Sequence, residues 1–409
     1  MLRDHANQII DAALQAAQPD TAVQKAVANY TFSKGKIILV AIGKAAWQMA
    51  KAACDLMGDR ISSGIVITKY DHGKGPLPPL EIYEAGHPVP DENTFTATKA
   101  AIAAVEGLTS EDTVLFLVSG GGSALFENPL VPPLELQEIT NQLLASGADI
   151  IEMNTLRKRL SAVKGGRFAQ LCAPAKVFSI VLSDIIGDPL DMIASGPTYP
   201  DRSTCEDAQA IVEKYHLQLS PQAQELLTQE TPKTLTNIDT AITGSVRQLC
   251  SAAYDTCKSL GYDPVVLTDS LNCTARDAGS FLAAIARYHQ NPTRAMAFIA
   301  GGETVVKLTG SGKGGRNQEI ALSAAEGIAQ LENVAVFSIG SDGTDGPTDA
   351  AGGFVDSGTF QKLKEQGLYV HTVLNNNDAY HALQKIDGLI ITGPTGTNVN
   401  DVSVLLIQK

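Results

Sequence analysis

The chain has 409 residues, 44% of them hydrophobic and 18% charged, a composition that excludes a disordered or fibrous protein and is long enough for two domains. Its formal net charge of −13 argues against nonspecific binding to nucleic acid or to an anionic membrane surface. No apolar run reaches the roughly 18 residues that a membrane-spanning helix needs.

The first 20 residues mix charged side chains with apolar residues at helical spacing. This pattern predicts an amphipathic helix and not a signal peptide. The six cysteines include no Cys-x-x-Cys pair. Without a secretory signal they are interpreted as reduced thiols, so a cytoplasmic protein is expected.

Short apolar runs alternate with Ala-rich helical stretches in the first half of the chain. Strands are predicted over Lys36–Ile42, Gly64–Thr68, Thr113–Val118 and Val177–Leu182, and a helix over Gly43–Met57. Continuous apolar strands separated by helices indicate mostly parallel sheets covered on both faces. The fold class is therefore predicted as α/β, with two α/β/α sandwich domains.

A polar segment, Thr228–Asp239, is the predicted linker between the domains. A Rossmann-like domain is expected over residues 1–235 and a second α/β domain over 236–409. In the second domain, strands are predicted over 240–243, 263–268, 295–300, 333–339 and 388–392. Because ligands bind beyond the carboxyl ends of strands in open α/β sheets, we expect the active site in a cleft between the domains.

A glycine-rich loop follows the predicted strand 113–118. It consists of Ser119, Gly120, Gly121, Gly122 and Ser123. Three glycines allow backbone N–H groups to approach an anion closely, and the serines can donate hydrogen bonds. The alternative is a flexible turn between strand and helix.

A second loop, Thr309–Asn317, combines glycine with basic side chains. Its glycines are Gly310, Gly312, Gly314 and Gly315. Lys313 and Arg316 among these glycines suit a triphosphate, although the register is not that of a Walker A loop. Asn317 opens a predicted helix whose dipole would favour an anion. The alternative is a solvated hairpin loop.

Three further sets of cations stand out in so acidic a chain. Lys164 and Arg167 flank a Gly pair, which favours a ligand contact, whereas Arg157–Arg159 suits a solvated helix face equally well. Lys44 follows the first predicted strand directly. A Lys at a helix start is disfavoured by the helix dipole, and this mismatch favours a functional role for Lys44.

Acidic residues follow predicted strands at several places: Asp184, Asp188, Asp342 and Asp345. Carboxylates in this position suit Mg²⁺, and an Asp can also accept the proton of a substrate hydroxyl. Asx-turn chemistry is the alternative for each of them. His87, a lone histidine before a proline, is interpreted as structural.

These motifs together resemble the glycerate 2-kinase family, whose carboxyl-terminal module is called the MOFRL domain. The matching segments are AIGKAAWQMA, AGHPVPDENT, VSGGGSALF, MNTLRKRLSAVKGGRFA, LSDIIGDPLDMIASGP, GGETVVKLTGSGKGGRNQE, GSDGTDGPTDAAGGFVD and ITGPTGTNVNDV. They run in one order from about residue 40 to residue 402, so the resemblance covers nearly the whole chain.

The resemblance implies that ATP phosphorylates the 2-hydroxyl of D-glycerate to give 2-phosphoglycerate and ADP. It also implies that Lys44 and Arg316 are the catalytic cations. Relatives in this family often carry the label hydroxypyruvate reductase. The expected partners are D-glycerate and ATP, with Mg²⁺ as cofactor and a homodimer left open.

Our hypothesis gives each motif a role in phosphoryl transfer, which needs positioning and charge neutralisation. Lys44 and Arg316 stabilise the transferring group, and Asp184 assists catalysis. Substrate contacts are assigned to 119–123, Lys164 and Arg167. Nucleotide contacts are assigned to Gly310, Gly312, Lys313, Gly314, Gly315, Asn317, Glu303, Asp342 and Asp345, and Mg²⁺ contacts to Asp184 and Asp188.

Two other functions stay open from the residues alone. The first is a hydroxypyruvate reductase, which would need a complete G-x-G-x-x-G dinucleotide motif that neither Gly43 nor Gly120–Leu125 supplies. The second is a noncatalytic module that binds sugar phosphates. Cation-bearing loops in both predicted domains favour the kinase over this module.

Overall fold

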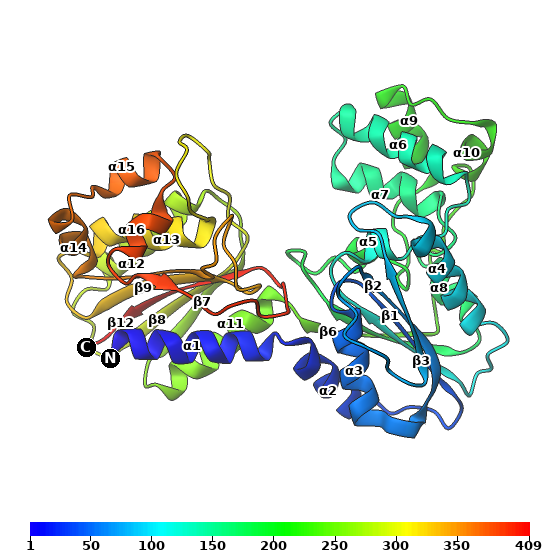
Figure 1. Ribbon diagram of the computed structural model, residues 1–409, viewed down its shortest axis with the longest axis horizontal. Helices are drawn as coiled ribbons and strands as arrows, with labels where there is room; N and C mark the ends of the chain where they lie inside the picture. The colour runs from blue at the N-terminus through cyan, green and yellow to red at the C-terminus, as the bar shows by residue number, and fades with distance from the viewer. The chain divides into compact units, whose positions relative to one another are not determined.

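The computed structural model describes residues 1–409, which form two compact units (Figure 1). The first, which we call the N-terminal unit, consists of Ala22–Ser183 and Asp188–Thr243. The C-terminal unit consists of Met1–Thr21, Asp184–Gly187 and Gly244–Lys409. No helix is both long and apolar enough to cross a membrane.

A six-stranded sheet with the order β3-β2-β1-β4-β5-β6 forms the centre of the N-terminal unit. Its strands are β1 (Ile37–Ile42), β2 (Ile61–Lys69), β3 (Leu80–Ala85), β4 (Thr113–Val118), β5 (Lys176–Leu182) and β6 (Ile238–Gly244). The pairs from β3 through β5 are all parallel. The loops after β1, β3 and β4 therefore leave the sheet at the same edge.

The helices of this unit either cover the two faces of the sheet or form a cluster of their own. They are α2 (Pro19–Ala28), α3 (Ala46–Met57), α4 (Glu92–Ala104), α5 (Gly122–Leu125), α6 (Pro133–Ala145), α7 (Ile150–Arg159), α8 (Arg167–Leu171), α9 (Cys205–Tyr215) and α10 (Pro221–Leu226), with short 3₁₀ turns at Gly58–Arg60 and Ile193–Ser195. Leu39 in β1 packs in one core with α2 and α3, whereas Val40 packs in another with α4 and α8. Successive side chains of β1 thus enter two different cores, which is the reason that β1 is apolar throughout. Helices α6, α7, α9 and α10 form a separate helical cluster (Figure 1).

The C-terminal unit has a second six-stranded sheet, with the order β11-β10-β9-β12-β8-β7. Its strands are β7 (Asp263–Leu271), β8 (Met296–Gly302), β9 (Val334–Gly340), β10 (Gly352–Asp356), β11 (Leu389–Ile390) and β12 (Asp401–Ile407). Strand β12 runs antiparallel to β8 and β9, so its first residue, Asp401, lies opposite Gly302 and Gly340 where those strands end. Strand β10 is also antiparallel to its neighbours, and the other strands share one direction.

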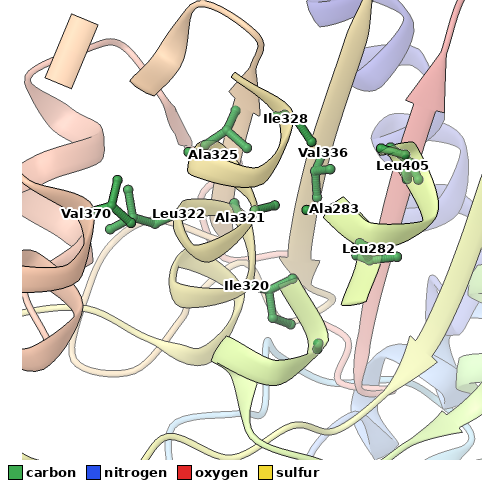
Figure 2. Close-up of a cluster of buried hydrophobic side chains, with 14 of the residues drawn as sticks. Leu282, Ala283, Ile320, Ala321, Leu322, Ala325, Ile328, Val336, Val370 and Leu405 are labelled. Carbon is green, nitrogen blue, oxygen red and sulfur yellow. The ribbon is translucent and has the colours of Figure 1, made fainter. Parts of the chain in front are cut away.

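Helices also cover both faces of the second sheet. They are α1 (Leu2–Ala16), α11 (Val246–Ser259), α12 (Ala275–Tyr288), α13 (Arg316–Ile328), α14 (Thr359–Glu365), α15 (Val370–Asn375) and α16 (Ala379–Gln384). Figure 2 shows α13 in the core of one face, with Leu322 near Val370 of α15 and Ile328 near Val336 of β9. Because α13 packs against several neighbouring elements, the position of its first residue, Arg316, is fixed.

The predicted α/β class and the α/β/α layering around each of the two sheets are confirmed, and so are the strands at 36–42, 113–118 and 177–182. The compact units differ from the predicted domains in one short segment, Asp184–Gly187, and in two complete elements. Strand β6, expected to begin the second domain, adds to the first sheet beside β5. Helix α1, expected in the first domain, packs through Ile9 and Ala13 against α11 of the C-terminal unit. The placement of both elements arises from packing partners distant in sequence.

Candidate active site

Lys44 lies where β1 leaves the first sheet. Gly43 has φ of 109°, and a side chain there would collide with the Ser119 carbonyl oxygen at 2.4 Å. The Lys44 main-chain N–H donates to the Gly120 carbonyl at 2.9 Å, and Thr68 Oγ1 donates to the carbonyls of Gly43 and Lys44. The backbone is thus fixed on both sides, while the exposed Lys44 side chain has no acidic partner.

The loop Ser119–Ser123, here called the glycine loop, follows β4 at the same edge. Ser119 is buried, and its Oγ accepts the Ala45 N–H at 3.0 Å. Its side chain therefore links the loop to the residue that follows Lys44. In contrast, the four main-chain N–H groups of residues 120–123 have no hydrogen-bond partner in the structure. Gly121 has φ of 87°, which favours glycine. The loop therefore keeps the donors that an anion needs.

Lys164 and Arg167 lie near this loop and donate to main-chain carbonyls. Lys164 is fully buried, and its Nζ donates to the carbonyls of Ser123 and Phe126 at 2.8 Å each and lies 3.4 Å from Glu127. Burial lowers the pKa of Lys164 to about 8, although Glu127 raises it. In this structure Lys164 supports the glycine loop. Its contact with substrate stays a prediction, and its hydrogen bonds to main-chain carbonyls do not favour that role.

Arg167 has a similar structural environment. Its Nη1 donates to the Arg159 carbonyl at 3.0 Å and the Ser161 carbonyl at 2.5 Å, where α7 ends. Lys158 and Arg159, for which a solvated face was the alternative, are buried and pair with Asp201 at 3.0 and 3.5 Å. These cations anchor α7 within the unit.

Asp184 and Asp188 follow β5, as the sequence predicts. Asp188 adopts φ of 51°, and its Oδ1 is buried without a hydrogen-bond partner. An unpartnered carboxylate oxygen is suited to a cation. No group of three or more His, Cys, Asp or Glu side chains is placed to hold a metal ion. The donor set thus fits a Mg²⁺ ion held largely by nucleotide phosphates, with one or two protein carboxylates.

A strained turn follows Asp188 and contacts the glycine loop. Ala194, Ser195 and Gly196 have consecutive φ values of 51°, 61° and 64°. Ser195 Oγ lies 3.1 Å from Ser123 Oγ and donates to Asn154 Oδ1 at 3.0 Å. Left-handed backbone at non-glycine residues is costly and is concentrated at functional sites. Sequence reasoning missed this turn, for which the Ser-Gly pair was the available signal.

Arg316 is the first residue of α13, at the edge of the second sheet. Its Nε and Nη2 donate to the two carboxylate oxygens of Asp401 at 2.5 and 3.0 Å, and its Nη1 donates to Glu303 at 2.9 Å. Burial alone would lower the pKa of Arg316, but Asp401 and Glu303 raise it above its ordinary value. A guanidinium has five N–H donors, so two remain for a ligand.

Asp401 was missed because the strand that it opens was not predicted. The signal was the apolar run Val402–Ile407 directly after Asn400-Asp401. Asp401 is buried, and burial raises its pKa while Arg316 acts against that rise. A bidentate pair of this kind fixes the plane of the guanidinium.

The loop Thr309–Gly315, here called the basic loop, is not the open anion cradle that the sequence predicts. The N–H groups of Thr309 and Gly310 donate to Asn377 Oδ1 at 2.7 and 2.9 Å. Those of residues 311–313 donate to Asn376 and Asp378. Lys313 Nζ lies over the ring of Tyr380, 4.3 Å from its centroid. Only the N–H groups of Gly314 and Gly315 lack partners in this loop.

Asp345 and Asn317 also have internal partners. Asp345 is buried and accepts the N–H groups of Asn317 and Gln318 at 3.1 and 2.8 Å, so it caps α13. Burial raises the pKa of Asp345 to about 7, although these two N–H groups lower it. Asn317 is fully buried and accepts the Ser338 hydroxyl. Glu303 and Asp342 are more accessible, and Asp342 Oδ1 accepts the Thr344 N–H at 2.9 Å. The predicted nucleotide contacts of Asp345 and Asn317 are therefore not favoured.

Comparisons with known proteins agree along the whole chain. Residues 5–228 match the family described as a domain of unknown function (DUF4147), and residues 296–401 match the MOFRL family. A D-glycerate 2-kinase from Thermotoga maritima is 50% identical, covering 99% of this chain and 98% of that protein. A glycerate 2-kinase from Pyrococcus horikoshii is 39% identical, covering 100% and 98%. A protein from Agrobacterium vitis named putative hydroxypyruvate reductase is also 39% identical, covering 91% and 100%.

A solved structure gives the same result for the fold. The crystal structure of a Thermotoga maritima glycerate kinase superposes with a TM-score of 0.94 at 50% sequence identity, covering 99% of each chain.

Proposed function

This chain belongs to the glycerate 2-kinase family and is a glycerate 2-kinase, and on that premise we propose which residues and cofactors carry the reaction. The overall reaction moves a phosphoryl group to the 2-hydroxyl of D-glycerate. The hydroxypyruvate reductase name among its relatives is only a putative label. We propose ATP as the phosphoryl donor and Mg²⁺ as its cation.

Arg316 carries the proposed phosphate contact in the C-terminal unit. Three of its five donors are held by Asp401 and Glu303, which leaves two in a fixed plane for a phosphate oxygen. This fixed guanidinium is the observation that carries the proposal most directly. The unpartnered N–H groups of Gly314 and Gly315 lie directly before it in the chain and are proposed to add to the contact.

The glycine loop and Lys44 carry the proposed substrate contacts in the N-terminal unit. Free N–H groups at residues 120–123 suit the glycerate carboxylate or a phosphate oxygen. Lys44 supplies a cation with no competing acid. Lys164 and Arg157 donate to the Ser123 carbonyl at 2.8 and 3.2 Å and hold the loop in place.

Lys44 and Arg316 are proposed to stabilise the negative charge that spreads over the transferring phosphoryl group. Such preorganised cations act by positioning and electrostatics, without a covalent intermediate. A Mg²⁺ ion, when bound, neutralises charge on the nucleotide phosphates. Asp188, whose Oδ1 is unpartnered, is the proposed protein ligand for that ion, with Asp184 as the second candidate.

The proposed location is the cytoplasm. It is supported by the six cysteines, none of which forms a disulfide. A homodimer stays a prediction from the sequence.

The donor and the metal can be tested in one experiment. Purified protein is mixed with D-glycerate, ATP and Mg²⁺, and ADP is measured with and without excess EDTA. We expect ADP that depends on both glycerate and free Mg²⁺. In parallel, hydroxypyruvate and NADH should give no NADH oxidation. ADP formation that EDTA leaves unchanged would contradict the metal assignment, and NADH oxidation would support the reductase.

A further inference from the structure

His87 lies at the same sheet edge as Lys44 and the glycine loop. It follows β3, and its ring and the Lys44 side chain both border the place where a side chain of Gly121 would lie. A Cβ built on Gly121 would be 3.0 Å from His87 Cδ2, 3.1 Å from His87 Nε2 and 3.4 Å from Lys44 Cγ. Glycine at 121 therefore allows the imidazole edge and the lysine stem to lie directly against the glycine loop, whose N–H groups at residues 120–123 are unpartnered.

The imidazole of His87 has no hydrogen-bond partner in the structure. Four of the seven histidines do have one; for example, His5 contacts Tyr262, His371 contacts Asn375, and His381 contacts Asp378. His87 is partly buried, and neither of its ring nitrogens is paired with a protein group. Both nitrogens are therefore available to a ligand, one as a donor and one as an acceptor in the neutral ring.

The surroundings of His87 favour the neutral form of its ring. Burial lowers its pKa first, and the nearby charges of Lys44, Lys69 and His72 lower it further. The neighbouring carboxylate, Asp91, is engaged with Tyr70 at 2.6 Å and with the Thr94 N–H at 3.0 Å. A neutral imidazole has one nitrogen that accepts a hydrogen bond, which a protonated one does not.

We propose that His87 is a catalytic residue of the glycerate reaction: its neutral imidazole accepts the hydrogen bond, and then the proton, of the attacking glycerate hydroxyl. This inference rests on the proposed function. In the transfer, the hydroxyl oxygen forms a bond to the γ-phosphorus, and the bond from the γ-phosphorus to the bridging oxygen breaks. The electron pair of that bond leaves with ADP. The hydroxyl proton passes to the imidazole and from there to solvent.

His87, interpreted from the sequence as structural, thus accepts the hydroxyl proton in place of an Asp that follows a strand. Lys44 and the loop N–H groups attract an anionic substrate, and His87 is the acceptor beside them. A cation and a neutral acceptor at one point suit a hydroxy acid, whose carboxylate and hydroxyl lie on neighbouring carbons.

His87→Gln tests the proposal, because glutamine keeps a polar side chain but cannot take up a proton at neutral pH. With nucleotide saturating, kcat/KM for D-glycerate is measured against pH for the wild type, His87→Gln and the control His371→Gln, an exposed histidine of the C-terminal unit. The wild type and the control should lose activity as pH falls through a pKa below the ordinary value of about 6.5. His87→Gln should lose this acidic limb, with kcat lower by about 10²-fold and the nucleotide KM unchanged.

A purely structural role for His87 would leave the acidic limb in place, and that result would overturn the proposal. A measurement on the unaltered protein complements the variant. Histidines are acylated with diethylpyrocarbonate, with and without D-glycerate, and each site is quantified by mass spectrometry. Glycerate should protect His87 and leave His371 reactive; equal acylation of His87 in both samples would contradict the inference. If the wild type releases no glycerate-dependent ADP, the proposed function fails instead.

Discussion

Replacing Arg316 by alanine should lower kcat by about 10³- to 10⁵-fold, the range that arginines acting on a transferring phosphoryl group supply in other enzymes. The effect should fall on kcat because these donors matter most once charge spreads over the transferring group. The fold should survive, since burial already raises the pKa of Asp401, which can take up a proton when its cation is removed. Steady-state kinetics with D-glycerate and ATP provide the measurement.

Two other variants make this result specific. Arg316→Lys keeps the charge but loses the two-pronged contact to Asp401, so it should recover only part of the lost rate. Arg294→Ala is the control, because Arg294 is 72% exposed and pairs only with Asp263 at 2.6 Å. Near-normal turnover in Arg316→Ala would show that the guanidinium takes no part in transfer.

Replacing Lys44 by alanine should lower kcat by about 10²- to 10³-fold, the cost of removing one preorganised donor from a developing charge. The loop geometry should be retained, because the main-chain N–H of residue 44, and not its side chain, contacts the Gly120 carbonyl. The loss therefore reports on the ammonium group itself. Steady-state kinetics and a thermal unfolding curve on the same sample give both quantities.

Lys51→Ala is the matched control for Lys44. Lys51 lies further along α3 and forms an exposed pair with Asp55 at 2.5 Å, a kind of contact worth little to stability. Its variant should retain wild-type kinetics. A comparable loss of activity in both variants would mean that the net charge of this region, and not the position of Lys44, matters.

The central strands could be predicted from the sequence because parallel strands buried on both faces are uniformly apolar. Ile37–Ile42 and Thr113–Val118 are examples. The partners of segments distant along the chain could not be predicted. Neither the packing of α1 on α11 nor the addition of β6 to the first sheet leaves a local signal. Strand β12 was missed although its apolar run is visible, and Asp401 was missed with it.

The candidate site shows the same division. The glycine loop was predicted from three consecutive glycines, and the N–H groups of its residues 120–123 are unpartnered. The basic loop has an equally favourable local sequence, but residues 376–378 take most of its N–H groups. Lys164 is a similar case, since its carbonyl partners lie about 40 positions earlier in the chain. A glycine-rich sequence indicates where donors can be presented, and only the fold determines whether they are already paired.

The position of the phosphoryl group on the product tests the account most directly. Protein, ATP, Mg²⁺ and D-glycerate are incubated, and the mixture is assayed with enolase alone, without phosphoglycerate mutase. Phosphoenolpyruvate formed by enolase alone would identify 2-phosphoglycerate, the result that the account predicts. Phosphoenolpyruvate that forms only after mutase is added would identify attack by the 3-hydroxyl and would contradict the account.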